Sequence, residues 1–126
     1  MDFTRGKLYV KLINDVMVSL FVPLESKPAN FNFMLCRTLA SGSDTSFGAS
    51  VGFVTEMDND GEKTRMGVLT YRAATDEDLK FIVAKWLGEI SLERWLEVLA
   101  IQVGIFKEEK TRISNIAKEL GKIPTI

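Results

Sequence analysis

The stretch KLYVKLINDVMVSLFV, residues 7–22, decides the fold of this chain. It holds two apolar runs, 7–13 and 16–22, which are rich in valine, leucine, isoleucine and aromatic residues and are separated only by Asn14 and Asp15. Runs of this composition favour β-strands, and two turn-forming residues between them are typical of a tight hairpin. Both faces of this hairpin are apolar, one with Leu8, Val10, Leu12, Met17 and Phe21 and the other with Ile13, Val16, Val18, Leu20 and Val22.

The strand pattern continues beyond this hairpin. Residues 31–37 alternate between apolar and less apolar side chains after a connection that is bracketed by two prolines. Residues 46–55 and 63–72 then form a second predicted hairpin around the Asp/Asn/Gly-rich residues 58–61. The sequence therefore predicts a five-stranded, mainly antiparallel sheet over about residues 7–72, arranged as a meander because its connections are short.

After the fifth strand the apolar spacing changes to that of a helix. Thr75 and Asp78 have the spacing of a capping box and Gly88 is a natural stop, so a helix is predicted over about residues 76–87. Ser91 can cap a further helix. Strands followed by helices predict an α+β fold, in which all 126 residues form a single domain and two or three C-terminal helices cover one face of the sheet.

The C-terminal segment has the most regular spacing in the chain. From Leu92 to Leu120, apolar residues follow a four-three-four-three spacing interrupted only by Lys110, which is the pattern of a heptad seam. A continuous helix over residues 91–120 would be about 45 Å long, whereas a globule of this size has a radius of gyration of about 14 Å. Two interpretations follow: the helix breaks near residues 109–111, or it extends onto a partner.

A second apolar face on this segment favours the partner. Val98, Ile101 and Ile105 lie roughly 140° from the seam, so the first half of the helix is apolar on two sides. Enclosure by the core of one monomer is one explanation. The other is a homo-oligomer, most simply a two-fold dimer. The residues expected at that contact are Ile101, Ile105, Phe106 and Ile113.

The composition argues against several classes of function. The 16 basic and 17 acidic side chains are evenly spread, so the basic stripe typical of nucleic-acid binding is not visible. The sequence has no histidine, which removes the commonest general base and transition-metal ligand. We therefore predict a protein that is not an enzyme and uses no cofactor. A pocket that groups Asp44 with Arg37 or Arg65 would change this view.

The single cysteine, Cys36, rules out an internal disulfide and predicts a cytoplasmic protein. Its position within a strand predicts a small buried side chain, not a nucleophile. No apolar run approaches the roughly 20 residues that a membrane span needs, and residues 1–5 lack a signal-peptide pattern. We therefore expect no membrane partner.

Three polar segments have some features of a binding or catalytic site. Residues 56–61 resemble part of a calcium loop without its final glutamate, so we interpret them as a hairpin turn and predict no metal site. Residues 41–46 offer hydroxyl groups and amides but lack the Gly-Lys-Ser/Thr ending of a P-loop, so we interpret them as a surface loop. Ser114, Lys118 and Lys122 fall at helical spacing and are interpreted as a solvated helix face.

The second predicted hairpin has a face rich in glycine. Gly48, Ser50 and Gly52 alternate onto one face, and glycines inside a strand indicate that something approaches closely. A helix packed tightly on the sheet explains this pattern. The alternative is the floor of a groove, completed across the hairpin by Arg65 and Tyr71, that binds a planar anionic ligand such as a nucleotide.

These observations lead to three functional hypotheses. The first is a small non-catalytic interaction protein, of the accessory, inhibitor, chaperone or immunity type, that presents a surface to another protein. The alternative is a module that binds or sequesters a small anionic ligand. The third is a single-stranded nucleic-acid binder that stacks bases on Tyr9, Phe31, Phe33 and Tyr71.

Overall fold

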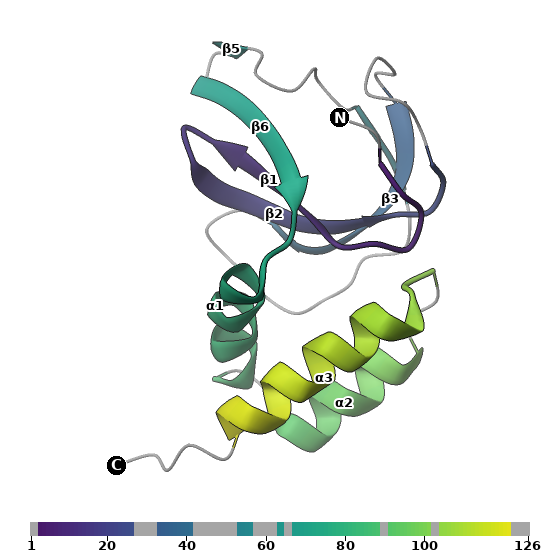
Figure 1. Cartoon of the computed structure of the whole chain (residues 1–126), viewed down its shortest axis with the longest axis vertical. Coiled ribbons are helices and arrows are strands. Elements are labelled where there is room, and N and C mark those ends of the chain that lie inside the picture. The colour runs from purple at the N-terminus through teal and green to yellow at the C-terminus, as the bar shows by residue number, and fades with distance from the viewer. Residues whose placement is uncertain are drawn as a thin grey trace.

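The computed structural model describes residues 3–26, 33–41, 53–56, 63–64, 67–88, 91–101 and 104–121. Within these residues, a curved antiparallel sheet lies over a layer of helices, which confirms the α+β class (Figure 1). The predicted number of five strands is wrong, because six strands and three helices form in this part of the chain. They are β1 (Tyr9–Ile13), β2 (Val16–Pro23), β3 (Phe33–Ser41), β4 (Phe53–Glu56), β5 (Lys63–Thr64), β6 (Gly67–Ala73), α1 (Asp76–Leu87), α2 (Leu92–Ile101) and α3 (Lys107–Gly121).

The turn between β1 and β2 is the tight one that its sequence predicts. Asn14 and Asp15 have φ angles of 51° and 64°, and two consecutive positive φ angles are typical of a type I′ turn. Asn14 also joins this turn to β6. Its backbone N–H donates to the carbonyl of Val68, and its side-chain oxygen accepts a hydrogen bond from the Val68 N–H, each at 2.9 Å.

The register of this hairpin corrects the predicted faces of β2. Tyr9 pairs with Phe21 and Val10 pairs with Leu20. Directly paired residues lie on the same face of a sheet, so Phe21 shares a face with Tyr9, and Leu20 shares one with Val10. The prediction that placed Phe21 beside Val10 is wrong. The irregularity in pairing after Lys11 is one reason that simple alternation failed here.

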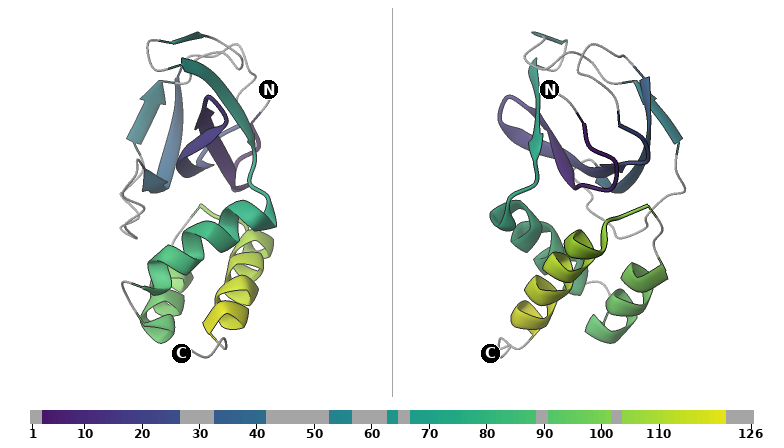
Figure 2. Two further views of the ribbon diagram at one scale, coloured as in Figure 1. Left: turned by 90° about the vertical axis from the view of Figure 1, so that its left-hand side faces the viewer. Right: turned by 45° about the vertical axis from the view of Figure 1, so that its right-hand side comes forward.

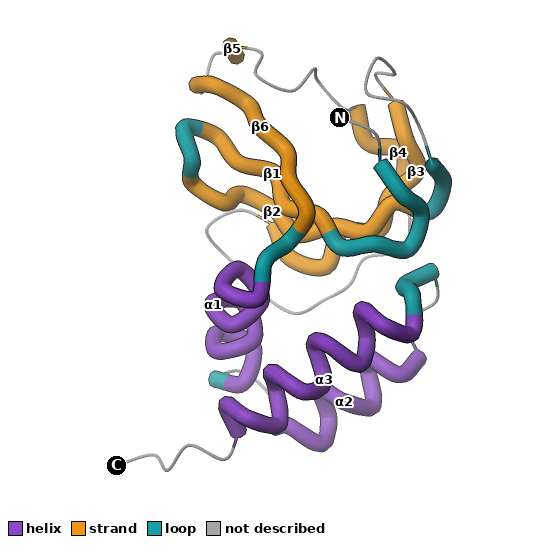
Figure 3. The backbone as a smooth tube through the Cα atoms, in the orientation of Figure 1, coloured by secondary structure: helices purple, strands orange, loops and turns teal. Residues whose placement is uncertain are grey.

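The strand order is β4-β3-β2-β1-β6-β5, and every pairing between neighbours is antiparallel. The first four strands form the predicted meander, but β6 returns to the free side of β1. The predicted second hairpin, residues 46–55 with 63–72, is therefore wrong where the structure describes it. Strand β4 pairs with β3, while β6 pairs with β1 and with the short β5, and the two groups lie on opposite sides of the β1–β2 hairpin (Figures 2 and 3).

The hairpin is covered on both faces by side chains of the same chain. The face toward the helices carries an aliphatic cluster, which we call the helix-side core; it includes Leu8, Val10, Leu20 and Val22 of the hairpin, Leu79, Ile82 and Val83 of α1, and Ile105, Ile113, Ile116 and Ala117. The other face carries an aromatic core that includes Phe3, Tyr9, Phe21 and Tyr71, in which the centroids of neighbouring rings lie 5.1 to 6.1 Å apart. The two-sided apolar character of the hairpin is thus explained within one chain.

Helix α1 begins with the predicted capping box. The Asp78 N–H donates to Thr75 Oγ1 at 3.2 Å, and the Asp78 carboxylate accepts from the Thr75 N–H at 2.9 Å. Arg72 also donates two hydrogen bonds to this carboxylate, which ties the end of β6 to the start of α1. The helix ends at Leu87, before Gly88, and Ser91 accepts the Arg94 N–H as the predicted cap of α2.

Of the two interpretations of residues 91–120, the one in which the helix breaks agrees with the structure. Helix α2 ends at Ile101 and α3 begins at Lys107, so the break precedes residues 109–111, which lie inside α3. Gly104 has a φ of 88°, a left-handed conformation that ends helices, and a Cβ there would lie 2.5 Å from Leu24. After this turn α3 folds back beside α2 (Figure 1). None of the helices in the described part is long and apolar enough to cross a bilayer.

Candidate anion-binding pocket

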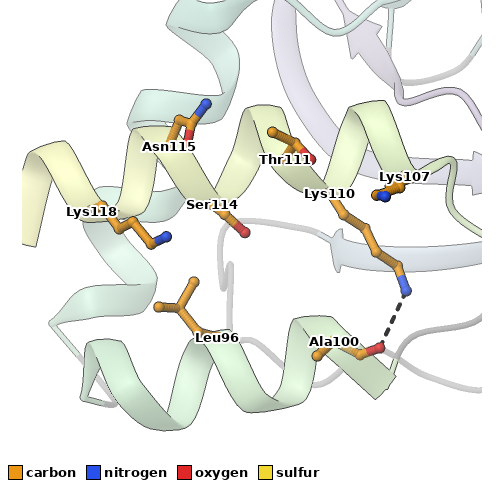
Figure 4. Close-up of a pocket in the computed structure, with 8 residues that line it drawn as sticks. All are labelled: Leu96, Ala100, Lys107, Lys110, Thr111, Ser114, Asn115 and Lys118. Atoms are coloured by element: carbon orange, nitrogen blue, oxygen red, sulfur yellow. Dashed lines mark hydrogen bonds between the residues drawn. The ribbon is translucent and has the colours of Figure 1, made fainter.

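The groove between α2 and α3 contains a pocket of about 440 Å³, within the usual size range of small-molecule sites. Its α2 wall is apolar and consists of Leu96 and Ala100. Its α3 wall is polar and basic, and consists of Lys107, Lys110, Thr111, Ser114, Asn115 and Lys118 (Figure 4). Among the residues that the structure describes, no acidic side chain lines the pocket.

Helical spacing places these polar side chains on one wall. Residues 107, 110, 111, 114 and 118 follow intervals of three or four, and residues at these intervals share one face of a helix. Ile113, Ile116 and Ala117 lie on the opposite face and are buried in the helix-side core. Burial of the apolar face therefore fixes the rotation of α3 and directs its lysines toward α2.

Lys110 joins the two walls. Its ammonium group donates a hydrogen bond to the carbonyl of Ala100 at 3.4 Å, in the last turn of α2 (Figure 4). Carbonyl groups in the last turn of a helix have no partner within the helix, and a lysine there also complements the helix dipole. Because an ammonium group has three N–H donors, two remain for a ligand.

The lysines of the pocket differ from several other basic residues of the molecule in their lack of an ion pair with a described carboxylate. Ion pairs join Arg94 to Glu97 on α2, and join Lys80, Arg112 and Arg72 to Glu77, Asp76 and Asp78 in the first turn of α1. No carboxylate in the described part of the chain forms an ion pair with Lys107, Lys110 or Lys118. Three positive charges along one pocket, without such neutralisation, attract anions.

The ligand site predicted from the sequence is not assembled by the described strands. Its residues Gly48, Ser50, Gly52 and Arg65 lie outside the described residues. Tyr71 lies in the aromatic core, where its side chain is 5% exposed and packs against the rings of Phe3 and Phe21. Tyr9 is buried in the same core, so neither tyrosine is accessible for stacking a nucleic-acid base.

Two of the four predicted contact residues for a dimer are buried within the chain. Ile105 and Ile113 belong to the helix-side core. Phe106 is 41% exposed and its ring lies against Gly6, while the side chain of Ile101 lies outside the described part. The burial of Ile105 and Ile113 needs no second copy, and self-association stays a prediction.

Cys36 is buried, as its sequence context predicts. Burial raises the pKa of its thiol to about 12, and the charge of Glu25 acts in the same direction, so the thiol stays protonated at neutral pH. Arg37 lies half-buried on β3, whereas Asp44, Arg65 and the Asp/Asn-rich residues 57–61 lie outside the described part. Within the described part, no group of three acidic, cysteine or histidine side chains lies close enough to hold a metal ion.

The α2–α3 pocket was not predicted from the sequence. The sequence pattern favours a solvated helix face at Ser114 and Lys118. The same spacing extends back to Lys107 and Lys110, and this longer polar stripe is the signal that could indicate the basic wall. That signal could not reveal the second wall. Leu96 and Ala100 face these lysines only because the chain reverses at Gly104.

Comparison with protein-family models, curated proteins and solved structures finds no match to this chain. The functional argument therefore rests on the chemistry of the pocket. That chemistry consists of ammonium, hydroxyl and amide groups on one wall and hydrocarbon on the other.

Proposed function

We propose that the protein binds a small anionic ligand, without chemical conversion, in the pocket between α2 and α3. The observation that carries this proposal is the set of three lysines, Lys107, Lys110 and Lys118, along a pocket of about 440 Å³. No described carboxylate pairs with them. The ligand class agrees with the alternative hypothesis from the sequence, but the site is a different one.

The other donors of the pocket suit phosphate or carboxylate oxygens. Thr111 and Ser114 contribute hydroxyl groups, and Asn115 contributes an amide, beside the ammonium groups. Hydrogen bonds from a charged donor to an anionic oxygen are roughly twice as strong as those between neutral groups. The apolar wall shields one side of the ligand from water, which strengthens these interactions further.

Two carboxylates of the described part, those of Asp78 and Glu109, have structural roles, which supports binding without catalysis. Asp78 caps α1, and Glu109 Oε2 accepts a hydrogen bond from the Leu8 N–H at 2.7 Å. An acid or base for proton transfer must reach the reacting group. Neither of these carboxylates lines the pocket.

A non-catalytic interaction protein is the second candidate, and it rests on a different surface. Phe81 on α1 is 53% exposed, and the ammonium group of Lys85 lies 4.7 Å from the centre of its ring. An exposed aromatic ring next to a cation is a common anchor in protein interfaces. This surface lies on α1, which contributes nothing to the pocket lining, so the two candidates can be tested separately.

Isothermal titration calorimetry with pyrophosphate tests the first candidate. The double variant Lys107→Gln/Lys110→Gln should bind at least about tenfold more weakly than the wild type, since each charge-assisted hydrogen bond contributes about 1.5–3 kcal/mol before screening. Lys80→Gln/Lys85→Gln is the matched control, because it makes the same two charge changes on α1, away from the pocket lining. Absence of pyrophosphate binding by the wild type, or an equal loss in the control, would contradict the proposal.

A further inference from the structure

We infer that the ligand of this pocket carries two anionic groups, one at each end of a short apolar linker. This inference rests on the proposed anion binding and names the class of ligand. Its basis is the order of side chains along the groove. Lys107 and Lys110 lie at one end, Lys118 lies at the other, and Ser114 lies between them (Figure 4).

The positive charges are separated along the axis of α3. Lys110 and Lys118 are eight residues apart, which corresponds to about 12 Å along a helix, and Lys107 and Lys118 are about 16 Å apart by the same measure. The hydrogen bond to Ala100 holds the Lys110 ammonium group at the C-terminal end of α2. A single phosphate or carboxylate group at that end therefore leaves Lys118 without a contact.

The middle of the groove does not favour an additional anionic group of the ligand. On the α2 side the groove is lined by hydrocarbon, with Leu96 opposite Lys118 and Ala100 beside Lys110, and the Ser114 hydroxyl lies between the two charged ends (Figure 4). An anionic oxygen in the middle of the groove would meet the Ser114 hydroxyl but no ammonium group, and it would lose hydration against the hydrocarbon of α2, which is unfavourable. A methylene linker would instead bury apolar surface there. The groove thus favours a dianion with an apolar centre over a continuous polyanion such as inorganic triphosphate.

The test is calorimetric titration of the whole protein with hexyl phosphate, hexanediol bisphosphate and inorganic triphosphate. Hexyl phosphate should occupy the end with two lysines. Hexanediol bisphosphate should bind about tenfold more tightly, because its second phosphate reaches Lys118 as an intramolecular event. Triphosphate should bind more weakly than the bisphosphate. Butanediol and octanediol bisphosphates show whether affinity has an optimum at one linker length.

Lys118→Gln tests the contribution of one end of the pocket alone. This substitution should lower the affinity for hexanediol bisphosphate about tenfold, to about the wild-type affinity for hexyl phosphate. Lys80→Gln, on α1, should alter neither affinity. Lys118 is exposed, so the variant is expected to fold normally, which a thermal melt verifies.

The outcomes distinguish this inference from the proposed function. Equal affinities for the mono- and bisphosphate, or tighter binding of triphosphate, would overturn the two-ended ligand while leaving anion binding intact. A Lys118→Gln variant that keeps the wild-type affinity for hexanediol bisphosphate would also overturn it, because the second phosphate would then not contact Lys118. Failure of the wild type to bind any of these compounds or pyrophosphate would refute both proposals.

Discussion

The two faces of α3 have different roles: one is buried in the core, and the other lines the groove beside α2. The inner face buries Ile113, Ile116 and Ala117 against the sheet and α1. The outer face presents lysines and hydroxyl groups to the groove beside α2. One helix therefore contributes to the core with one face and to the candidate site with the other, so substitutions on the two faces should have different effects.

Polar residues at the inner edge of α3 strengthen this contrast, because they have partners in the fold. Glu109 accepts the Leu8 N–H, and Arg112 donates to the Ala74 carbonyl at 2.6 Å and to Asp76 at 2.7 Å. These bonds join α3 to β1 and to the junction between β6 and α1. Charges on the inner edge thus position the helices against the sheet, whereas the lysines on the outer face form no ion pair with a described carboxylate.

The largest effect on stability is expected from Ile113→Ala. Ile113 is 0% exposed, and removing a buried aliphatic side chain costs about 2–5 kcal/mol through lost burial and the cavity that remains. Urea denaturation should show a loss of about 3 kcal/mol. Lys118→Ala on the outer face should change stability by less than about 0.5 kcal/mol. Equal losses for the two variants would contradict the separation of the faces.

A smaller effect is expected from Asp78→Asn, which tests a charge with a structural role. Burial of Asp78 raises its pKa, but the hydrogen bonds from Arg72 and Thr75 outweigh burial, so the pKa of this carboxyl lies below its usual value of 3.8. The variant should lose about 1 kcal/mol at neutral pH, because it removes the charge that Arg72 and the capping box contact.

The pH dependence of this effect has a defined sign. Because the folded pKa of Asp78 is lowered, its contribution is complete above the unfolded pKa of about 3.9 and is lost as the pH falls through the folded value. The difference in stability between wild type and Asp78→Asn should therefore shrink in urea titrations below about pH 4. A difference that grows in acid would show that this carboxylate does not act through its charge.

The smallest effect on stability is expected from Lys110→Met, which keeps most of the aliphatic chain and removes the ammonium group. The loss of one exposed bond to the Ala100 carbonyl should change stability by at most about 0.5 kcal/mol in thermal and urea melts. Pyrophosphate binding should weaken several-fold in the same protein. A large loss of stability would show that Lys110 serves mainly to hold α2 and α3 together.

Local features of the fold could be predicted from the sequence. The turn at Asn14 and Asp15, the capping box of Thr75 and Asp78, and the cap at Ser91 all occur as predicted. Each depends on residues within a few positions of one another, whose side chains and preferred φ angles favour one backbone path. The order of strands followed by helices could also be predicted, because the spacing of apolar residues changes after Arg72 from the pattern of strands to that of a helix.

Tertiary contacts decided the features that the sequence left open or predicted wrongly. The apolar spacing continues through Gly104, so only the packing of this turn against Leu24, and the burial of Ile105, show that the chain reverses there. The return of β6 to β1 likewise joins segments far apart in the chain. Periodicity reports which face of an element is apolar, but not which other element covers it. The α2–α3 pocket exists only because these distant segments meet, and that is why its lysines looked from the sequence like an ordinary solvated face.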